Sequence, residues 1–507
     1  MAPAPHYLMA LLSRTTNEVL SYLSCSVFLS GIAGAICHSF SFGMQRSIAT
    51  NTYETAWFAV IFSWAGLNLL FLLRKKQFSL KSIWFELAVI TWLGCASFIS
   101  LVCLGYSQDW ASFTWVLVTY IPVLASAFFL LERKNGFESD EYQTETPAVT
   151  AKMMAAGLCL LKVIFTVIVT LLASGSILSA IAVSYPATGR PISVLFNGAN
   201  RNGTLQLFCI GTANISKSTV FIFSSSAHGI VDLYGVQYFL STSNETNRRV
   251  CTHDPLGFGW SQDPFVGQFT NYEYLYRLML SSGESSPWHI VGWGGGGSAV
   301  MYLATKQTSS IKSVTFVETF PPGVEFNYYG YQNGLSQQAV SEYRSEQLSS
   351  RLGLVRLILA MAIPWGLMGL FIPISPRDEN YHPPDRWSEF RVQMWKSKVW
   401  VTQYHALQHF QVTLDSHDPL ISGAPLPSQI PVFGVYCNVT ETCGLLDQGE
   451  QDSDCFSMSE TVSMIRAINP NATISYISEI GCDLALPVKK PLITALSILK
   501  HYSSIEA

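Results

Sequence analysis

One stretch of sequence decides the fold of the second half of the chain: His289-Ile-Val-Gly-Trp-Gly-Gly-Gly-Gly-Ser-Ala-Val-Met-Tyr-Leu-Ala304. It begins with a short apolar run rich in β-branched residues, which is typical of a buried strand. The glycines Gly294 to Gly297 follow, and the residues from Ser298 onward have the apolar spacing of a helix. A strand, a glycine turn and a helix in direct succession predict one strand–helix unit of an α/β sheet.

Similar runs lie on both sides of this stretch. Helical spacing occurs at Ser298–Lys306 and Pro491–His501. Because strands alternate with helices, we predict a mostly parallel sheet with helices on both faces. The predicted buried strands are Thr219–Phe223, Arg249–Thr252, His289–Val291, Val314–Val317 and Pro431–Tyr436.

In order and spacing these segments resemble the α/β-hydrolase fold family, across roughly residues 188–502. Arg249–Ser261 is similar to the family's fourth-strand signature, and the glycine-rich stretch is similar to its strand, nucleophile elbow and following helix. Val314–Pro322 resembles the sixth strand with its exit, and Ile430–Tyr436 resembles the seventh. Glu479–Pro491 resembles the loop that presents the catalytic histidine before the last helix.

The resemblance also locates the catalytic positions, and their chemistry is missing. The family's elbow is Gly-x-Ser-x-Gly, whereas this chain has Gly-Trp-Gly-Gly-Gly with Gly294 at the nucleophile position. The histidine position holds Cys482, and a thiol replaces an imidazole base poorly. The acid position after the seventh strand holds Cys437 and Asn438, and the next aspartate is Asp447. These residues predict a catalytically degenerate, membrane-anchored member, a pseudoenzyme and not an enzyme.

Other residues near the elbow are weaker candidates. Ser298 lies one helical turn beyond the elbow, so we expect its hydroxyl to miss the oxyanion pocket. His228 and Gly229 follow the third strand and, with Gly295, form the vestigial oxyanion region that the resemblance implies. We prefer a turn whose glycine relieves backbone strain over a residual anion pocket. Asp254 is predicted to fix a turn by hydrogen bonding. The histidines lack metal-ligand spacing, and neither a metal nor a cofactor is predicted.

The first 183 residues form a predicted five-span transmembrane domain, because five apolar runs approach the length of a membrane-crossing helix. Cations crowd the connection after the second run and the connection after the fourth. This bias places the amino terminus in the cytoplasm and residues 184–507 outside it. The first run is predicted to be a retained signal anchor. The runs are Val19–Phe42, Ala56–Leu73, Ile83–Gly105, Ala111–Leu131 and Gly157–Val183.

A further uncharged run, Leu357–Ile374, lies inside the hydrolase-like half. Its length permits a sixth span, but a crossing there would separate the last strands of one sheet from the first. We therefore predict a helical lid insertion at about residues 323–428, with this run on the membrane surface or against the spans. A docking face is preferred over an entry site for lipid.

Sequons and cysteines agree with an extracytoplasmic second half. Glycosylation sequons occur after Ser184 but not before it, at Asn202, Asn214, Asn244, Asn438 and Asn471. An even number of cysteines outside the cytosol permits disulfides, and the sequence leaves their pairing open. The disulfide candidates are Cys209, Cys251, Cys437, Cys443, Cys455 and Cys482.

Composition limits the possible functions. The chain is 49% hydrophobic and 13% charged with a net charge of −4, which argues against an ordinary cytosolic enzyme and against nucleic acid as a partner. The preferred hypothesis is an inactive hydrolase-like membrane glycoprotein that acts as a structural or accessory subunit, with other membrane subunits and lid-bound lipid as partners. The alternatives are a membrane-bound esterase- or lipase-like serine hydrolase with a rearranged site, and a receptor that binds lipid or another ligand in the vestigial pocket.

The same features predict where the protein resides. Sequons on the extracytoplasmic side favour the secretory pathway, the cell surface or a ciliary membrane. An organelle inner membrane is the alternative if the sequons are unoccupied.

Overall fold

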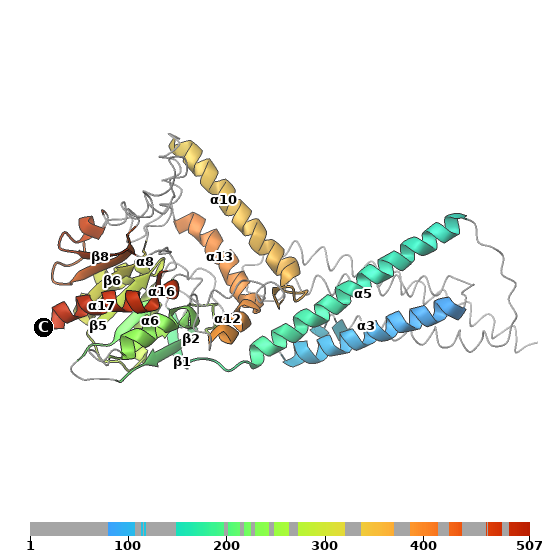
Figure 1. Cartoon of the computed structure of the whole chain (residues 1–507), viewed down its shortest axis with the longest axis horizontal. Helices are drawn as coiled ribbons and strands as arrows, with labels where there is room; N and C mark the ends of the chain where they lie inside the picture. Colours follow the sequence, from blue (N-terminus) through green and yellow to red (C-terminus); the bar gives the residue numbers. More distant parts are fainter. Residues whose placement is uncertain are drawn as a thin grey trace, which may run out of the picture. The chain divides into compact units, whose positions relative to one another are not determined.

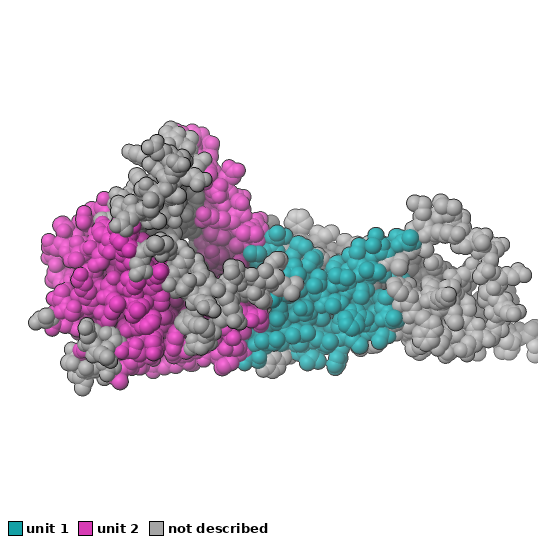
Figure 2. All heavy atoms as spheres, in the orientation of Figure 1, with its two compact units in different colours: residues 1–184, 357–374 teal, residues 185–356, 375–507 magenta. Residues whose placement is uncertain are grey.

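The computed structural model divides the chain into two compact units (Figures 1 and 2). Unit 1 contains residues 1–184 and 357–374, and unit 2 contains residues 185–356 and 375–507. Unit 1 thus takes residues 357–374 from within the predicted lid insertion. The structure describes residues 80–106, 113–114, 116–117, 149–196, 201–212, 217–224, 229–242, 248–262, 272–319, 336–369, 386–413, 425–438, 463, 465–478 and 486–506.

Unit 2 is built on an eight-stranded sheet with the strand order β1-β2-β4-β3-β5-β6-β7-β8. The β1–β2 and β2–β4 pairs are antiparallel, and all pairs from β4 across to β8 are parallel. The predicted mostly parallel sheet is therefore confirmed. The strands are β1 Arg190–Phe196, β2 Arg201–Ile210, β3 Val220–Phe223, β4 Val250–His253, β5 Trp288–Trp293, β6 Ile311–Val317, β7 Val432–Cys437 and β8 Thr473–Ile477.

Helices cover both faces of the sheet, as two adjacent residues of β5 demonstrate. Trp288 packs edge-on against Tyr276 of α7, with ring centroids 6.3 Å apart. The next residue, His289, stacks on Tyr502 of α17 with a centroid distance of 4.1 Å. Because successive strand residues point to opposite faces, α7 and α17 lie on opposite sides. The helices are α6 Ile230–Thr242, α7 Glu273–Ser281, α8 Gly296–Lys306, α16 Leu486–Lys489 and α17 Pro491–Glu506, with the 3-10 helix η1 at Thr308–Ser310.

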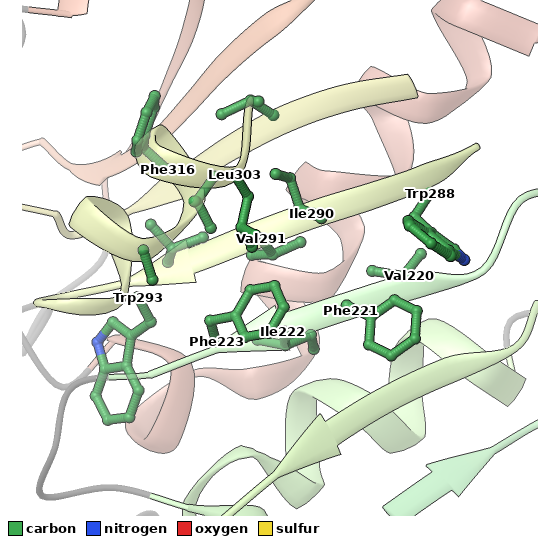
Figure 3. Packing of buried hydrophobic residues seen from close by; sticks show 14 of the residues in the cluster. Val220, Phe221, Ile222, Phe223, Trp288, Ile290, Val291, Trp293, Leu303 and Phe316 are labelled. Atoms are coloured by element: carbon green, nitrogen blue, oxygen red, sulfur yellow. The ribbon is translucent and has the colours of Figure 1, made fainter. Parts of the chain in front are cut away.

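The core follows the burial expected of each strand position. Every residue of β3 and β5 is buried, as in a parallel strand covered on both faces. In β1, near the sheet edge, the inward residues Ile192, Val194 and Phe196 are buried and alternate with exposed ones. Figure 3 shows Phe221, Phe223 and their neighbours from β5 packed between the layers.

The described part of the segment between β6 and β7, where the lid is predicted, is largely helical. It contains α10 Gln337–Leu357, the π-helix η2 Ile358–Ala362, α12 Trp387–Met394 and α13 Ser397–Thr413. Within unit 2, Arg356 at the end of α10 donates to the Tyr404 hydroxyl of α13 over 2.6 Å.

Unit 1 contains α3 Leu80–Tyr106 and α5 Val149–Ser184, which pack against each other. Trp92 Nε1 of α3 donates to Thr170 Oγ1 of α5 over 2.8 Å. Among the described residues, one helical stretch, Lys162–Ser184, is long and apolar enough to cross a membrane, and Ala88–Cys103 is shorter. The predicted five-span bundle is therefore not confirmed. Its runs Val19–Phe42 and Ala56–Leu73, and nearly all of Ala111–Leu131, lie outside the described residues.

Candidate functional site

The carboxyl ends of the parallel strands form one edge of the sheet, here called the carboxyl edge, and the predicted elbow lies there. β5 ends at Trp293 and α8 begins at Gly296. Gly294 has a φ of +53° between them, and its N–H donates to Val317 O of β6 over 3.1 Å. The left-handed backbone of a strand-to-helix elbow is thus present at the position where the nucleophile is expected.

The glycines of the elbow are required for different reasons. A Cβ on Gly296 would lie 2.3 Å from Phe223 O of β3, and a Cβ on Gly297 would lie 2.0 Å from Thr319 Cγ2. A Cβ on Gly292 would lie 2.8 Å from the Gly297 backbone. These three glycines are required because α8 approaches the strands closely. In contrast, a Cβ on Gly294 would have no atom of the described residues within 4 Å. Gly294 therefore has room for a side chain but carries none, while Gly295 beside it is exposed.

The backbone N–H groups at the start of α6 are bonded to carboxylates of the protein itself. The Gly229 N–H donates to Asp232 Oδ2 over 2.9 Å, and the Ile230 N–H donates to Asp254 Oδ1 over 2.9 Å. Gly229 is not among the glycines with positive φ, so the prediction that it relieves backbone strain is wrong. Close approach is the reason, since its Cβ would lie 2.2 Å from Asp254 Oδ1. His228 lies outside the described residues.

Asp254 organises the loops around this edge. Its side chain is fully buried, and Oδ2 accepts the Trp260 N–H over 2.9 Å in addition to the bond from Ile230. Burial raises the pKa of Asp254 to about 6, although these two backbone bonds and the nearby Lys398 and Lys396 oppose the shift. The carboxylate thus joins the loop before α6 to the loop after β4. This arrangement agrees with the prediction that Asp254 fixes a turn.

Two lysines of the lid are fastened to the loop after β4. Lys396 Nζ lies 5.0 Å from the centre of the Trp260 ring and donates to Gly259 O over 3.4 Å. Lys398 Nζ donates to Ser261 O over 2.7 Å. Burial, followed by the charge of Lys398, lowers the pKa of Lys396 to about 7. The sequence indicated a lid but not these contacts, which join segments about 137 residues apart.

The structure describes only part of the positions expected to supply the base and the acid. Cys482 lies outside the described residues. The Asn438 N–H donates to Ile477 O over 2.6 Å, and Asn438 Nδ2 donates to Ser478 Oγ over 2.7 Å. Cys437 is disulfide-bonded. Ser298 is 2% exposed within α8, which agrees with the expectation that its hydroxyl misses the site.

Glu318 is a carboxylate of this edge that sequence analysis missed. It follows β6 directly, has a φ of +41° and is 1% exposed. Its Oε1 accepts the Cys437 N–H of β7, so it fixes the end of the neighbouring strand. The available signal was a charged residue immediately after a buried strand.

The opposite end of the strands, here called the amino edge, contains a polar cluster around the buried residues Arg248 and His289, which the sequence did not predict. Arg248, which is 1% exposed, pairs with Glu506, and Lys312 Nζ lies 3.2 Å from Glu506 Oε1. His289 contacts Glu506 Oε1 through Nε2 at 3.2 Å and Ser313 Oγ through Nδ1. Burial lowers the pKa of His289, although the bond to Glu506 opposes this shift. Burial acts to raise the pKa of Glu506, but bonds from His289 and Arg248 outweigh it and lower the pKa.

This cluster has the order serine, histidine, carboxylate, but it is unsuited to catalysis. Ser313 and His289 are both fully buried, so a substrate cannot contact the hydroxyl. Arg248 also holds the carboxylate in an ion pair and lies 5.1 Å from the centre of the Tyr502 ring. The cluster fastens α17 to the sheet.

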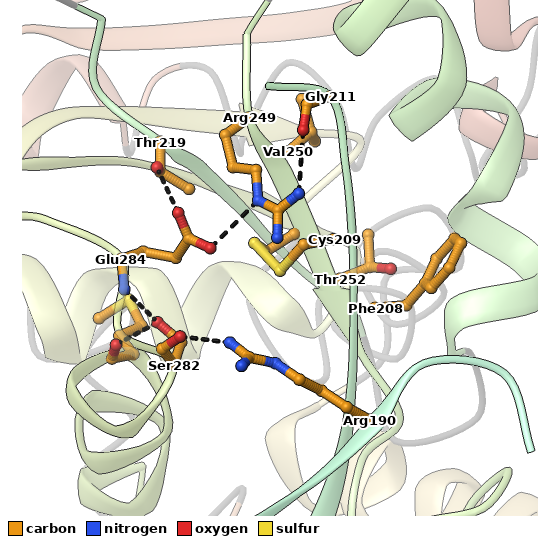
Figure 4. Close-up of a disulfide and its surroundings, with 12 residues drawn as sticks. Arg190, Phe208, Cys209, Gly211, Thr219, Arg249, Val250, Thr252, Ser282 and Glu284 are labelled. Atoms are coloured by element: carbon orange, nitrogen blue, oxygen red, sulfur yellow. Dashed lines mark hydrogen bonds and ion pairs between the residues drawn. A yellow bond between two sulfur atoms is a disulfide. The ribbon is translucent and has the colours of Figure 1, made fainter. Parts of the chain in front are cut away.

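The structure pairs Cys209 of β2 with Cys251 of β4, which face each other in the antiparallel register (Figure 4). Arg249 and Glu284 form an ion pair beside the disulfide, with Nε and Oε1 3.1 Å apart. Because the two sulfurs are oxidised to each other, their proximity to Glu284 does not make a thiolate metal site. Cys443 and Cys455 lie outside the described residues.

Two of the predicted glycosylation positions are accessible. Asn202 on β2 and Asn471 before β8 are exposed. Asn438 is half-buried, and Asn214 and Asn244 lie outside the described residues.

The strand order, the elbow at the end of β5 and the helices on both faces match the resemblance stated for the sequence. Unit 2 has an α/β-hydrolase-like fold. No protein-family model matches the chain, and no curated protein sequence is significantly similar to it.

Similar solved structures are hydrolases of low sequence identity. A thermophilic esterase from Thermogutta terrifontis has a TM-score of 0.42 at 15% identity, over 63% of this chain and 100% of that one. The enol-lactonase from Burkholderia xenovorans LB400 has a TM-score of 0.41 at 13% identity, over 61% and 99%. A hydrolase from Pseudomonas aeruginosa has a TM-score of 0.39 at 15% identity, over 62% and 98%. These similarities concern the fold alone and do not assign an activity to this chain.

Proposed function

We propose that this protein is a catalytically inactive, hydrolase-derived membrane protein that serves as a structural or accessory subunit of a membrane-associated complex. The observation that carries the proposal is Gly294, an elbow residue with a φ of +53° and open space where a nucleophile would stand. Acyl transfer needs a nucleophile and a base within hydrogen-bond reach of each other. An elbow without a side chain provides neither.

The neighbouring groups support inactivity because each is already engaged. The Gly229 N–H, an expected oxyanion donor, is bonded to Asp232 Oδ2. Asp254 holds two backbone N–H groups, and Glu318 holds the Cys437 N–H. Groups that position loops in this way maintain the fold but are poorly placed to exchange protons with a substrate.

The proposal includes a membrane anchor with an external hydrolase-like unit. The stretch Lys162–Ser184 supports it, together with the apolar runs and the distribution of cations in the first 183 residues. We retain five spans, a cytoplasmic amino terminus and the secretory pathway or cell surface as parts of the proposal. Occupied sequons at Asn202 and Asn471 would support this location, and glycosidase treatment that leaves gel mobility unchanged would count against it.

The test for catalysis is labelling of the purified full-length protein with a fluorophosphonate, with an active serine hydrolase as positive control. We expect no labelling of the wild type or of Ser298→Ala. A Gly294→Cys variant should react with a small maleimide, because the new thiol would enter open space. Fluorophosphonate labelling of the wild type that disappears in Ser298→Ala would establish the alternative, a membrane-bound serine hydrolase with a rearranged site.

The subunit role needs a separate measurement. We expect the protein to migrate on native gels, after mild detergent extraction, as part of an assembly that contains other membrane proteins. A monomer that carries a bound acyl chain, identified by native mass spectrometry, would instead favour a lipid-binding receptor that uses the open position at Gly294.

A further inference from the structure

Residues 357–374 interrupt the hydrolase-like unit but belong to the compact unit that contains α5 (Figure 2). The run contains no charged side chain. Arg356, just before the run, bonds to Tyr404 of α13 in unit 2. The β6 and β7 strands, which precede and follow the run in the sequence, pair in one sheet. The chain before the run and the chain after it therefore contribute to the same sheet.

The contact with α5 is one of backbone against backbone. A Cβ on Gly175 of α5 would lie 2.0 Å from Pro364 O, and a Cβ on Gly366 would lie 2.8 Å from Gly175 N. One turn later along α5, Leu178 Cδ1 lies 2.7 Å from the Cβ position of Gly369. Small residues that allow such close approach are typical of helix packing inside a membrane.

The irregular backbone of this turn satisfies its own hydrogen bonds. Trp365 N donates to Met361 O and Gly366 N donates to Ile363 O, both over 3.0 Å, and Gly369 N donates to Gly366 O over 3.1 Å. Ile363 N donates to Ile358 O, continuing the π-helical pattern of η2. Non-helical backbone is tolerated at membrane depth only where it is buried in protein or lines a water-filled cavity, and Ile363, Pro364 and Gly366 of this turn are buried.

The position of Gly175 along α5 shows how deep in the proposed span the contact with the segment lies. Gly175 precedes Ser184, the last residue of α5, by nine positions. A helix rises about 1.5 Å per residue, so Gly175 lies about 14 Å inside the end of the span. This is close to the middle of a hydrocarbon core about 30 Å thick.

We propose that residues 357–369 belong to a re-entrant segment, which enters the bilayer beside α5 and turns back at Pro364–Gly366 toward the side from which it came. Its partner is the acyl chains of the bilayer. Leu357, the first residue of the segment, is apolar and 55% exposed. The inference rests on the proposed membrane anchor, because it takes α5 as a span.

The experiment measures quenching of tryptophan fluorescence in vesicles of phosphatidylcholine whose acyl chains are brominated near the bilayer centre. The full-length protein contains 13 Trp, so each residue is observed as the difference between the wild type and its Trp→Phe variant. Trp365→Phe tests the segment. Trp92→Phe is the membrane control, since Trp92 is 51% exposed and bonds to Thr170 of α5. Trp260→Phe is the control in unit 2.

We expect the Trp365 and Trp92 components to be quenched at least twofold and the Trp260 component to be unaffected. Quenching of Trp92 without quenching of Trp365 would overturn the re-entrant segment but leave the anchor intact. Absence of quenching for both would overturn the anchor as well, and with it the membrane part of the proposed function.

A packing variant keeps the inference testable if Trp365→Phe perturbs the turn. Gly175→Val should displace the segment and abolish the Trp365 quenching while it leaves the Trp92 quenching unchanged. Gly157→Val is the matched control on the same helix, because a Cβ there has nothing within 4 Å. Equal Trp365 quenching in the two variants would contradict the contact at Gly175.

Discussion

The two edges of the parallel sheet in unit 2 differ in what their polar residues do. At the carboxyl edge the elbow is intact, but Gly294 offers no side chain and Asp254 bonds only to backbone. At the amino edge the buried residues Arg248 and His289 contact the carboxylate of Glu506. Among these described residues, the ion-paired side chains lie at the amino edge and not at the carboxyl edge, where the elbow lies.

Packing alone accounts for the glycine turn of the elbow. Gly296 and Gly297 let α8 approach β3 and the residues after β6, so the turn is fixed even where no nucleophile is displayed. The amino edge has a different task, which is to hold the carboxyl-terminal helix α17 on the sheet. Both edges therefore stabilise the fold, one through close approach and the other through charge.

The largest expected effect comes from breaking the amino edge. Arg248→Met leaves Glu506 and His289 without their main cation. Removal of one partner of a fully buried ion pair costs about 3–5 kcal/mol, and we expect the lower end of this range because Glu506 is partly exposed and keeps its contact with Lys312. The measurement is the thermal unfolding of the detergent-purified protein. Arg277→Met is the matched control, since Arg277 and Glu273 form a pair at 3.0 Å with side chains about one-third exposed. Such an exposed pair contributes about 0.5 kcal/mol or less. Equal losses in the two variants would contradict a buried role for the cluster.

The sequence was sufficient to predict the carboxyl edge but not the amino edge. The elbow has a local signature, a buried strand followed at once by glycines and a helix, so Gly294 was placed correctly at its turn. The amino-edge cluster joins Arg248 to Glu506, which are 258 residues apart. Neither residue has a pattern that predicts its partner, because the contact depends on how α17 lies on the sheet.

Two other features were missed for related reasons. The strands β1 and β2 were not predicted, although Ile192, Val194 and Phe196 alternate with outward residues as an edge hairpin requires. The sequence located Glu318 just after the sixth strand but did not predict its role. Its bond to Cys437 depends on the pairing of β6 with β7. Long-range pairing is needed to assign both features.

A pH experiment examines the carboxyl edge, where two adjacent buried groups have opposite shifts. Burial lowers the pKa of His253 from 6.5 to about 4, so its contribution to stability is present above pH 6.5 and is lost as the pH falls. Burial raises the pKa of Asp254 from 3.8 to about 6, so its contribution is present below pH 3.8 and is lost as the pH rises. Each shift corresponds to about 3 kcal/mol, and the two nearly cancel between these values.

Removing one of the two groups should reveal the other. In His253→Gln, the Asp254 contribution is no longer balanced, so the melting temperature should fall relative to wild type as the pH rises from about 4 to about 6. Melting temperatures of both proteins are measured across this range. Parallel curves would show that His253 is not held neutral by burial.

The smallest expected effect is a difference in unfolding free energy between alanine and asparagine variants at two glycines of the elbow. Gly294 is required only by its φ of +53°, so Gly294→Ala should cost about 1–2 kcal/mol. Gly294→Asn should cost less, because asparagine tolerates this backbone region better. Gly296 is required by space, since its Cβ would lie 2.3 Å from Phe223 O. Gly296→Ala should therefore cost about 3 kcal/mol, and Gly296→Asn at least as much. If asparagine proved better than alanine at both positions, backbone conformation rather than close packing would explain the whole glycine run.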